Sequence, residues 1–589
     1  MTFQIAITLA ILLLLLIALV RDWFRPHFIF VGALMALLVL GVLPPNVAFS
    51  GFSNEAVFTV AALFVVATGV QNTGAFSFME TLIFKEKSAL HTVAFKMMGL
   101  TAVLSAFLNN TPIVAMLIPQ VQAWADKKGV AASKLLIPLS YATIVGGTAT
   151  LIGTSTNIIV SGMMRQAGLE PIGLFELSYI GIPAAILTLL WFLCAGLRWL
   201  PSDRKVQSTE TPQNENDAYQ FDYRVPSQSS LSGKSIEQAG LRNLQQAFLV
   251  HIQRKEHLIG VVEPDFVIEA EDILTFSGTY EAVQAIATNK GLNPAIPGAN
   301  EKVKPLPLYE AVVSHSSPLV GKTLKETMFR YRFHGVVLAI KRKEEHIKGA
   351  LGNTPIQAGD LLLIEAKEDF ESRSGLLNRN FYLVRRKGQS LHAAGKKSTL
   401  ALSIIGGMLL SVALGVFPMV TAALLAAILM IVTGCVQKDQ LLNAIHPPIL
   451  IVIAAAIGIG KAVEVSGAAT WATEGILGTL TFSHPVFYIA LLYVLTNLFT
   501  EVITNNAAAV LMLPLAIVLA NQVGIPVHAA GVTVAMAASA SFLTPIGYQT
   551  NLMVMSVGGY KFTDYTKAGF PITLIMMVCT VMIVWWRYL

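Results

Sequence analysis

Two short polar segments interrupt long apolar runs, one near each end of the chain. Asn109-Asn110-Thr111 lies inside residues 90–125, and Thr504-Asn505-Asn506 lies inside residues 484–521. Their amide and hydroxyl oxygens are hard ligands, which suit a weakly held alkali cation. A helix that begins at such a segment also points free N–H groups at an anion. The two segments therefore predict re-entrant hairpins whose tips bind cations and an anion.

A second polar break follows each hairpin, over residues 146–157 and 541–551. Two halves with interrupted apolar segments in matching positions are typical of secondary transporters, whose site lies where the repeats meet. None of the four breaks contains Lys or Arg, so an anion there would be held by amide dipoles and co-bound cations. This composition predicts cation-coupled symport of an anion.

Two observations carry alternative interpretations. Asn, Thr and Gly in membrane helices also act as packing and hydrogen-bonding contacts between helices, although four breaks in register favour a binding site. Glu501 precedes the second hairpin tip. It is either a ligand for a proton or cation or a structural partner at the base of the hairpin.

Composition places the chain in the membrane. Only 13% of its 589 residues are charged and 54% are hydrophobic, whereas a soluble protein carries about a quarter charged residues. The net charge of +6 is explained by short basic loops rather than by a nucleic-acid-binding surface. No nucleophile, base or metal-ligand constellation occurs along the sequence, so we expect no enzymatic activity and no organic cofactor.

The apolar runs predict ten full membrane spans and two hairpins, arranged as two equivalent halves. Each half has three spans, an interfacial segment, a hairpin, a broken span and a last span. In the first half these are residues 4–20, 28–43, 56–72, 74–88, 90–125, 134–163 and 172–199. In the second half they are residues 398–416, 418–434, 446–463, 464–482, 484–521, 527–556 and 568–588.

Residues 201–395 differ from the rest because they are polar and charged. After a linker, a module occurs twice, since Leu231-Ser-Gly-Lys and Leu319-Val-Gly-Lys lie 88 residues apart. Short β-type runs between charged turns predict small α+β domains. The predicted division is a first transmembrane repeat, a linker, two small domains and a second transmembrane repeat, over residues 1–200, 201–217, 218–300, 301–395 and 396–589.

Basic residues in the loops predict the orientation. If the insert lies in the cytosol, most basic residues of the short loops lie there too, among them Arg21, Lys127 and Lys438, as the positive-inside rule requires. Both termini then lie outside, and the two halves are inverted relative to each other. We therefore expect a multi-pass protein of the cell membrane with the symmetry that alternating access requires.

These motifs resemble those of the divalent-anion/sodium symporter family. Phe107-Leu-Asn-Asn-Thr-Pro, Leu151-Ile-Gly-Thr-Ser-Thr-Asn and Thr544-Pro-Ile-Gly-Tyr-Gln-Thr-Asn look like its sodium/sulfate-transporter branch. The insert resembles the paired TrkA-C regulatory domains of that branch. The resemblance implies an elevator mechanism, a homodimer, co-transported sodium ions and an unidentified small ligand at the insert.

The same resemblance implies a set of site residues. The anion would lie among Asn110, Thr111, Thr154, Asn505, Asn506 and Gln549. Sodium ions would be bound by Asn109, Asn110, Gly153 and Ser155 in the first half and by Thr504, Asn505, Ile546 and Gly547 in the second.

Departures from the family pattern bear on the substrate. The family has Ser at the position of Asn109, Thr at that of Asn506, and Pro-Pro pairs at Ser155-Thr156 and Gln549-Thr550. Because the Pro-Pro positions contact carboxylates in the dicarboxylate branch, their absence favours sulfate or a similar divalent oxyanion. The alternatives are a dicarboxylate or arsenite carrier of the same fold or, in another class, a regulated ion channel or a membrane sensor.

Overall fold

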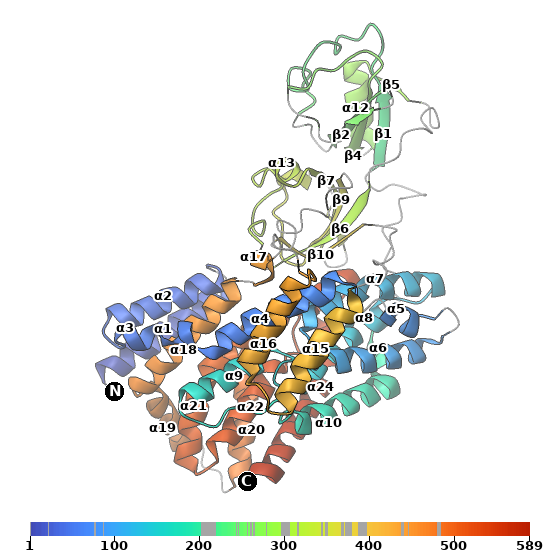
Figure 1. Cartoon of the computed structure of the whole chain (residues 1–589). Helices are drawn as coiled ribbons and strands as arrows, with labels where there is room; N and C mark the ends of the chain where they lie inside the picture. Colours follow the sequence, from blue (N-terminus) through green and yellow to red (C-terminus); the bar gives the residue numbers. More distant parts are fainter. Residues whose placement is uncertain are drawn as a thin grey trace. The chain divides into compact units, whose positions relative to one another are not determined.

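The computed structural model contains a helical unit that is interrupted in sequence by a β-rich unit (Figure 1). The helical unit comprises Met1–Lys205 and Leu391–Leu589, and the β-rich unit comprises Val206–Ser390. Residues 202–217 of the predicted linker and the predicted boundaries at 300 and 395 lie outside the described residues. The structure describes residues 2–21, 23–75, 78–85, 88–201, 219–242, 244, 247–255, 257–259, 262, 265–278, 280–295, 307–314, 317–342, 345–347, 351–366, 370, 380–386, 397–436, 441–445, 447–479 and 484–589.

The first half of the helical unit follows the predicted apolar runs. Its helices are α1 (Phe3–Val20), α2 (Pro26–Val39), α3 (Pro45–Ala48), η1 (Ser50–Ser53), α4 (Glu55–Asn72), α5 (Phe78–Ile83), α6 (Leu90–Ser105), α7 (Asn110–Lys128), α8 (Ser133–Gly147), α9 (Ser155–Gln166), α10 (Ser178–Trp191), η2 (Phe192–Gly196) and α11 (Leu197–Trp199). The hairpin is formed by α6 and α7, and the broken span by α8 and α9. In the last span, a π-helical turn, η2, joins α10 to α11.

The second half repeats this order. Its helices are α15 (Ser398–Ala413), α16 (Met419–Val432), α17 (Leu441–Ala444), α18 (Pro447–Val465), α19 (Ala468–Thr479), α20 (Pro485–Val502), α21 (Asn505–Val523), α22 (Val527–Ser539), α23 (Gln549–Gly558) and α24 (Phe562–Tyr588). The hairpin is α20 and α21, and the broken span is α22 and α23. Among the described residues, seven helices are long and apolar enough to cross a membrane, namely α1, α4, α10 with its extension, α18, α20, α21 and α24.

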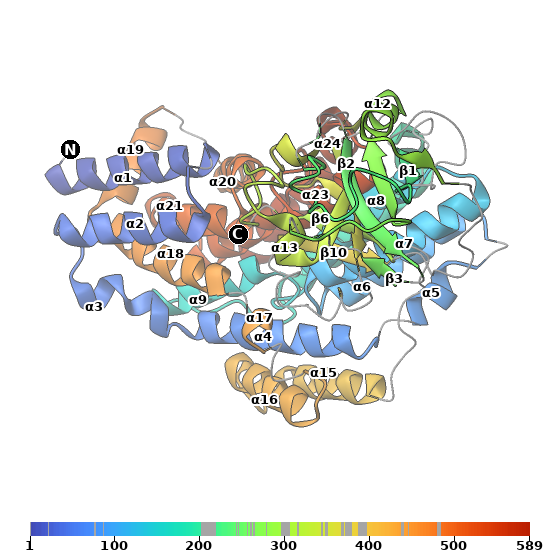
Figure 2. The ribbon, with the colours of Figure 1, turned by 90° about the horizontal axis from the view of Figure 1, so that it is seen from above.

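Helices of the two halves pack on each other reciprocally. α2 packs on α18 while α16 packs on α4, and α9 packs on α21 and α22 while α23 packs on α7 and α8. Figure 2 shows α15 and α16 side by side along α4. Each of these contacts recurs with the halves exchanged, which is the packing of two repeats related by a two-fold axis. It places each hairpin against the broken span of the other half.

Within the described residues, the β-rich unit holds two antiparallel sheets with the same strand order. The first has the order β3-β2-β4-β1-β5, with β1 (Tyr219–Arg224), β2 (Ala247–Arg254), β3 (His257–Ile259), β4 (Ile273–Gly278) and β5 (Asn293–Pro294). The second has the order β10-β6-β9-β7-β8, with β6 (Leu308–Val313), β7 (Gly335–Arg342), β8 (Glu345–His346), β9 (Leu361–Ala366) and β10 (Phe381–Arg386). Helices α12 (Tyr280–Lys290) and α13 (Phe329–Phe333) and the short turn η3 (Leu351–Asn353) complete it. The repeat in sequence is therefore a repeat in structure.

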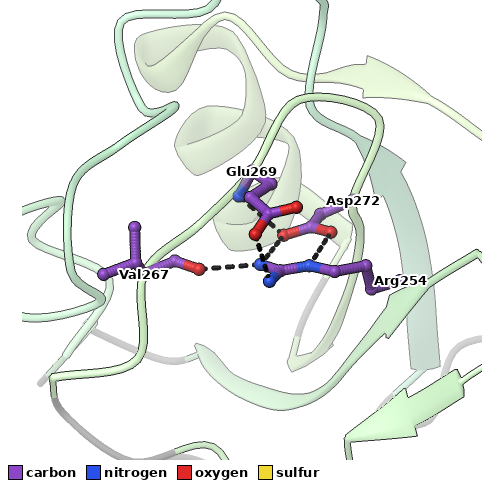
Figure 3. Close-up of polar contacts among 4 residues, drawn as sticks. All are labelled: Arg254, Val267, Glu269 and Asp272. Carbon is purple, nitrogen blue, oxygen red and sulfur yellow. Dashed lines mark hydrogen bonds and ion pairs between the residues drawn. The ribbon is translucent and has the colours of Figure 1, made fainter.

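An Arg–Asp pair holds the same turn in both copies. Arg254 donates to the two carboxylate oxygens of Asp272 at 2.9 and 2.8 Å and to the carbonyl of Val267 at 2.7 Å (Figure 3). Arg342 and Asp360 form the same two-bond pair, with both distances at 2.8 Å. Both Asp side chains are 1% exposed. A bidentate pair of this kind is short and directional, and its repetition indicates a structural role.

A carboxylate ties the loop before α10 to the second half of the helical unit. Glu176 accepts the N–H of Gly173 at 2.8 Å, contacts Nε2 of His528 at 2.6 Å and accepts the hydroxyl of Tyr588. Burial raises the pKa of Glu176, but the hydrogen bonds outweigh burial and lower it to about 2. The carboxylate is therefore ionised at neutral pH, where it links α10 to α22 and α24.

Glu176 is expected to make the protein more stable at neutral pH than in acid. Its pKa is about 2 in the folded protein, below its ordinary value of 4.5. The stabilisation is thus fully present above about pH 5 and is lost as the pH falls towards 2. We expect Glu176→Gln to lower the melting temperature at pH 7 and to flatten its dependence on pH. Thermal unfolding in detergent tests this, and an identical pH dependence in both proteins would contradict it.

Candidate functional site

Four helices begin at the polar breaks of the sequence. α7 begins at Asn110 with Asn109 as its N-cap, and the Asn109 side chain accepts the N–H of Thr111 at 3.4 Å. α21 begins with Thr504 as its N-cap. α9 and α23 begin after Thr154 and Tyr548. Each helix start leaves N–H groups without partners in its own helix and carries partial positive charge.

A hydroxyl near the end of the first helix of each hairpin holds the Asn at the tip. Ser105 contacts the amide oxygen of Asn110 and, at 2.7 Å, the carbonyl of Thr143. Thr500 contacts the amide oxygen of Asn505 at 3.0 Å and the carbonyl of Ala538 at 2.6 Å. The two sets lie at equivalent positions of the two halves. They fix both Asn side chains and tie each tip to the broken span of its own half, through α8 and α22.

Each hairpin tip also bonds the broken span of the other half. The Thr111 hydroxyl donates to the Gln549 side chain at 3.2 Å, and the Asn506 amide oxygen accepts the hydroxyls of Ser155 and Thr156, both at 3.1 Å. These two contacts are equivalent, with the halves exchanged. Three of the six predicted anion ligands, Thr111, Asn506 and Gln549, therefore form bonds between the two repeats.

Tyr548 adds a contact that has no equivalent in the first half. Its hydroxyl accepts the amide N–H of Asn110 at 2.6 Å, and its position corresponds to Thr154. Thr154 is 7% exposed, and its hydroxyl lies 3.5 Å from that of Thr156. The Tyr548 hydroxyl also forms a hydrogen bond with the Thr154 side chain, so one residue of the second half bonds both the hairpin tip and the broken span of the first half.

Two glycines let the breaks approach the hairpins closely. A Cβ on Gly153 would lie 2.7 Å from the Ser105 carbonyl oxygen, and a Cβ on Gly547 would lie 2.5 Å from that of Thr500. A cavity of about 40 Å³ lies beside the first tip, and Asn109, Gly153 and Ser155 are among the residues that line it. Such a volume accommodates one water-sized species. Three of the four predicted first-half sodium ligands thus face a common space, and Asn110 is not among the residues that line it.

Ile546 is the predicted ligand that stands apart. Its side chain is 65% exposed, so only its backbone can contribute to a site. Gly547 beside it donates its N–H to the Thr544 hydroxyl at 3.3 Å. Thr504 forms no side-chain hydrogen bond as N-cap, unlike Asn109. The second set of sodium ligands is therefore less similar to the first than the sequence alone predicts.

The Glu501 carboxylate accepts hydrogen bonds from backbone N–H groups. Its carboxylate accepts the N–H groups of Phe542, Leu543 and Thr544 at 2.7, 2.9 and 2.9 Å. These residues follow α22 and precede the turn that leads into α23. Of the two interpretations that the sequence leaves open, these contacts are the ones expected of the structural partner.

The sequence does not single out the side chains of three residues that bond the hairpin tips, namely Ser105, Thr500 and Tyr548. Laying the two hairpins over each other does place Ser105 on Thr500, two hydroxyl residues at the same position before the tips. That coincidence is a usable signal. No such signal marks the side chain of Tyr548, because the equivalent position of the first half is Thr154.

A family model and curated relatives place the chain among transporters. A family model described as a citrate transporter (CitMHS) matches residues 11–538. An uncharacterized transporter of Synechocystis is 31% identical over 99% of this chain and 97% of its own length. Sodium/sulfate cotransporter 2 of Chlamydomonas reinhardtii is 23% identical over 98% of this chain and 89% of its own length. The solved YdaH transporter of Alcanivorax borkumensis covers 92% of this chain and 86% of its own with 12% identity and a TM-score of 0.44.

Proposed function

The chain belongs to the citrate transporter (CitMHS) family, and we propose that it imports sulfate or a similar divalent oxyanion coupled to sodium. The observation that carries this proposal is the reciprocal bonding between each hairpin tip and the opposite broken span, through Thr111–Gln549 and Asn506–Ser155. These groups come from both halves and are all uncharged. A relative that spans nearly the whole chain is named a sodium/sulfate cotransporter.

The anion would bind where the four helix starts meet. Hydroxyl and amide groups of Thr111, Asn506 and Gln549 supply hydrogen-bond donors, and the N-termini of α7, α9, α21 and α23 supply partial positive charge. A tetrahedral oxyanion suits this arrangement because its oxygens accept hydrogen bonds in several directions at once. The breaks contain no Lys or Arg, so two negative charges require co-bound cations.

Sodium ions would bind on either side of the anion. The first set consists of Asn109, Asn110, Gly153 and Ser155, and the second of Thr504, Asn505, Ile546 and Gly547. All offer side-chain or backbone oxygens, which suit a hard cation. A further oxygen lies close to each set. Gly153 approaches the Ser105 carbonyl, and Gly547 approaches the Thr500 carbonyl.

Transport would proceed by alternating access between two repeats of inverted orientation. We infer an elevator movement, in which the hairpins and broken spans move as one body in a homodimer in the cell membrane. Both termini then lie outside and residues 201–395 lie in the cytosol. There the two related domains of the β-rich unit, as a pair of TrkA-C type, would bind a small ligand and regulate the rate.

The substrate separates this proposal from its alternatives. Uptake of labelled sulfate into proteoliposomes, driven by an inward sodium gradient, is measured with unlabelled sulfate, thiosulfate, succinate, citrate or arsenite as competitors. Sulfate and thiosulfate are expected to compete, and the carboxylates and arsenite are not. Competition by succinate or citrate without competition by thiosulfate would assign the carrier to carboxylates instead.

Removal of the Tyr548 hydroxyl is expected to slow sulfate uptake by about tenfold. Tyr548→Phe leaves the Asn110 amide without its acceptor at 2.6 Å, and a lost hydrogen bond of a buried group costs about 1–3 kcal/mol. Tyr493→Phe is the matched control, because the buried Tyr493 hydroxyl has no hydrogen-bond partner among the residues that the structure describes. Its loss is expected to change uptake little. Equal rates for both variants would show that the Asn110–Tyr548 contact is dispensable.

A further inference from the structure

Glu501 is a buried carboxylate in a site whose other groups are neutral. It lies near the end of α20 and is 6% exposed. Besides three backbone N–H groups, its oxygens accept the hydroxyl of Ser541 at 3.3 Å. Within the described part of the chain, all of its partners are N–H and O–H groups of residues 541–544. Four hydrogen bonds to one carboxylate stabilise its ionised form, which carries a negative charge.

The position of the first half that corresponds to Glu501 carries no charge. In the register that places Asn505 on Asn110, Glu501 falls on Ala106. The first-half N–H groups of Thr148 and Ala149 bond carbonyls of their own helix end, at 3.2 and 3.0 Å. α8 continues to Gly147, whereas α22 already ends at Ser539. The chain after α22 is therefore unwound, and Glu501 takes up the N–H groups that this unwinding releases.

A chain of hydrogen bonds connects Glu501 to the second set of sodium ligands. The Thr544 hydroxyl donates to the backbone carbonyl of Glu501 at 2.9 Å, and the same hydroxyl accepts the N–H of Gly547 at 3.3 Å. Thr500, the neighbour of Glu501, contacts the Asn505 amide oxygen at 3.0 Å. The carboxylate itself accepts the Thr544 N–H at 2.9 Å, so the charge is bonded to the turn that carries Gly547 of the second set.

We propose that Glu501 makes the two sodium sites unequal, so that the site of the second half binds sodium more tightly and fills first. This inference rests on the sodium coupling of the proposed function. A negative charge in a membrane interior attracts a nearby cation strongly, because the surroundings screen it little. Glu501 acts as a positioning residue, since it holds the 544–547 turn and adds charge without contacting the ion itself.

Sodium titration of uptake tests the role of the charge. Glu501→Gln is expected to raise the sodium concentration for half-maximal uptake about tenfold while the rate at saturating sodium is largely kept. Glu501→Asp keeps the charge and is expected to stay within about threefold of the wild type. Glu464→Gln, which removes an exposed carboxylate of the same half, is the control. A lower maximal rate with an unchanged half-saturating sodium concentration would reduce Glu501 to a structural clamp and overturn the inference.

A second measurement does not depend on how Glu501 variants fold. Stabilisation by sodium relative to choline is measured by thermal unfolding of the purified wild type, Asn110→Ala and Asn505→Ala. The equivalent positions of the two Asn residues make these a matched pair. Asn110→Ala is expected to keep stabilisation at the lowest sodium concentrations that stabilise the wild type, and Asn505→Ala is expected to lose it. Equal losses, or the reverse order, would overturn the inequality.

The two measurements also separate this inference from the proposed function. If sodium drives sulfate uptake but the Asn110 and Asn505 variants lose stabilisation by sodium equally, the unequal sodium sites are overturned and the proposed function stands. Unequal stabilisation by sodium in a protein that moves no sulfate overturns the proposed substrate and supports the inequality.

Discussion

Replacing Gly153 with alanine is expected to reduce sodium-driven sulfate uptake to about 1% of the wild-type rate or less. The added Cβ would lie 2.7 Å from the Ser105 carbonyl oxygen and would also meet backbone atoms of Gly147. Backbone cannot move aside like a flexible side chain, so the first hairpin tip and its broken span must separate. Misplacing binding groups by about 1 Å is enough for a hundredfold loss.

Gly99→Ala is the matched control for this prediction. Gly99 lies in α6, the same hairpin arm that ends at Ser105, and a Cβ there would meet nothing within 4 Å. Its replacement is expected to leave uptake within about twofold, since Ala is a better helix former than Gly. Initial rates of labelled sulfate uptake, normalised to reconstituted protein, give the comparison. More than half of the wild-type rate in Gly153→Ala would contradict the close approach at the first tip.

Loss of Arg254 is expected to destabilise the β-rich unit by about 3 kcal/mol or more. Arg254→Ala leaves the carboxylate of Asp272, which is 1% exposed, without the cation that bonds both of its oxygens. Breaking a buried pair by removing one partner costs about 3–5 kcal/mol, because the remaining charge stays buried. Arg342→Ala is expected to act in the same way on Asp360 in the second copy.

Arg224→Ala distinguishes a buried pair from an exposed one. Arg224 lies 3.2 Å from Glu271, with side chains 42% and 54% exposed, and exposed pairs contribute about 1 kcal/mol or less. Proteolytic cleavage of the β-rich unit in the full-length protein, followed against urea concentration, reports the stability of that unit. Equal shifts for Arg224→Ala and Arg254→Ala would contradict a special role for the repeated pair.

Much of the helical unit can be predicted from its sequence because each element carries a local signal. Apolar runs marked the helices, and Asn110 and Asn505 marked the points where two of them begin. The side chains that converge on the site were predicted through the repeat, since Thr111, Asn506 and Gln549 stand in polar breaks at matching positions. These features follow from local sequence signals that occur once in each repeat.

The remaining features depend on tertiary packing, which leaves little trace in one sequence. The Tyr548 hydroxyl reaches Asn110 from the other half of the chain, and no local pattern points to that partner. The backbone groups that bind Glu501 are released because α22 ends earlier than α8, a difference that is not visible as composition. In the insert, Asp272 and Asp360 lie 88 residues apart, as the repeated module requires, but their partners Arg254 and Arg342 come from the separate strands β2 and β7.

Labelled sulfate uptake into proteoliposomes, with and without an inward sodium gradient, distinguishes sodium-coupled transport through this site from its alternatives when wild type and Asn110→Ala are compared. Asn110 bonds Ser105 of its own hairpin and Tyr548 of the other half, so its loss removes a proposed sodium ligand and a contact between the halves. We expect uptake that requires sodium in the wild type and that is abolished in Asn110→Ala. Uptake that is indifferent to sodium, or that persists in Asn110→Ala at the wild-type rate, would contradict this expectation.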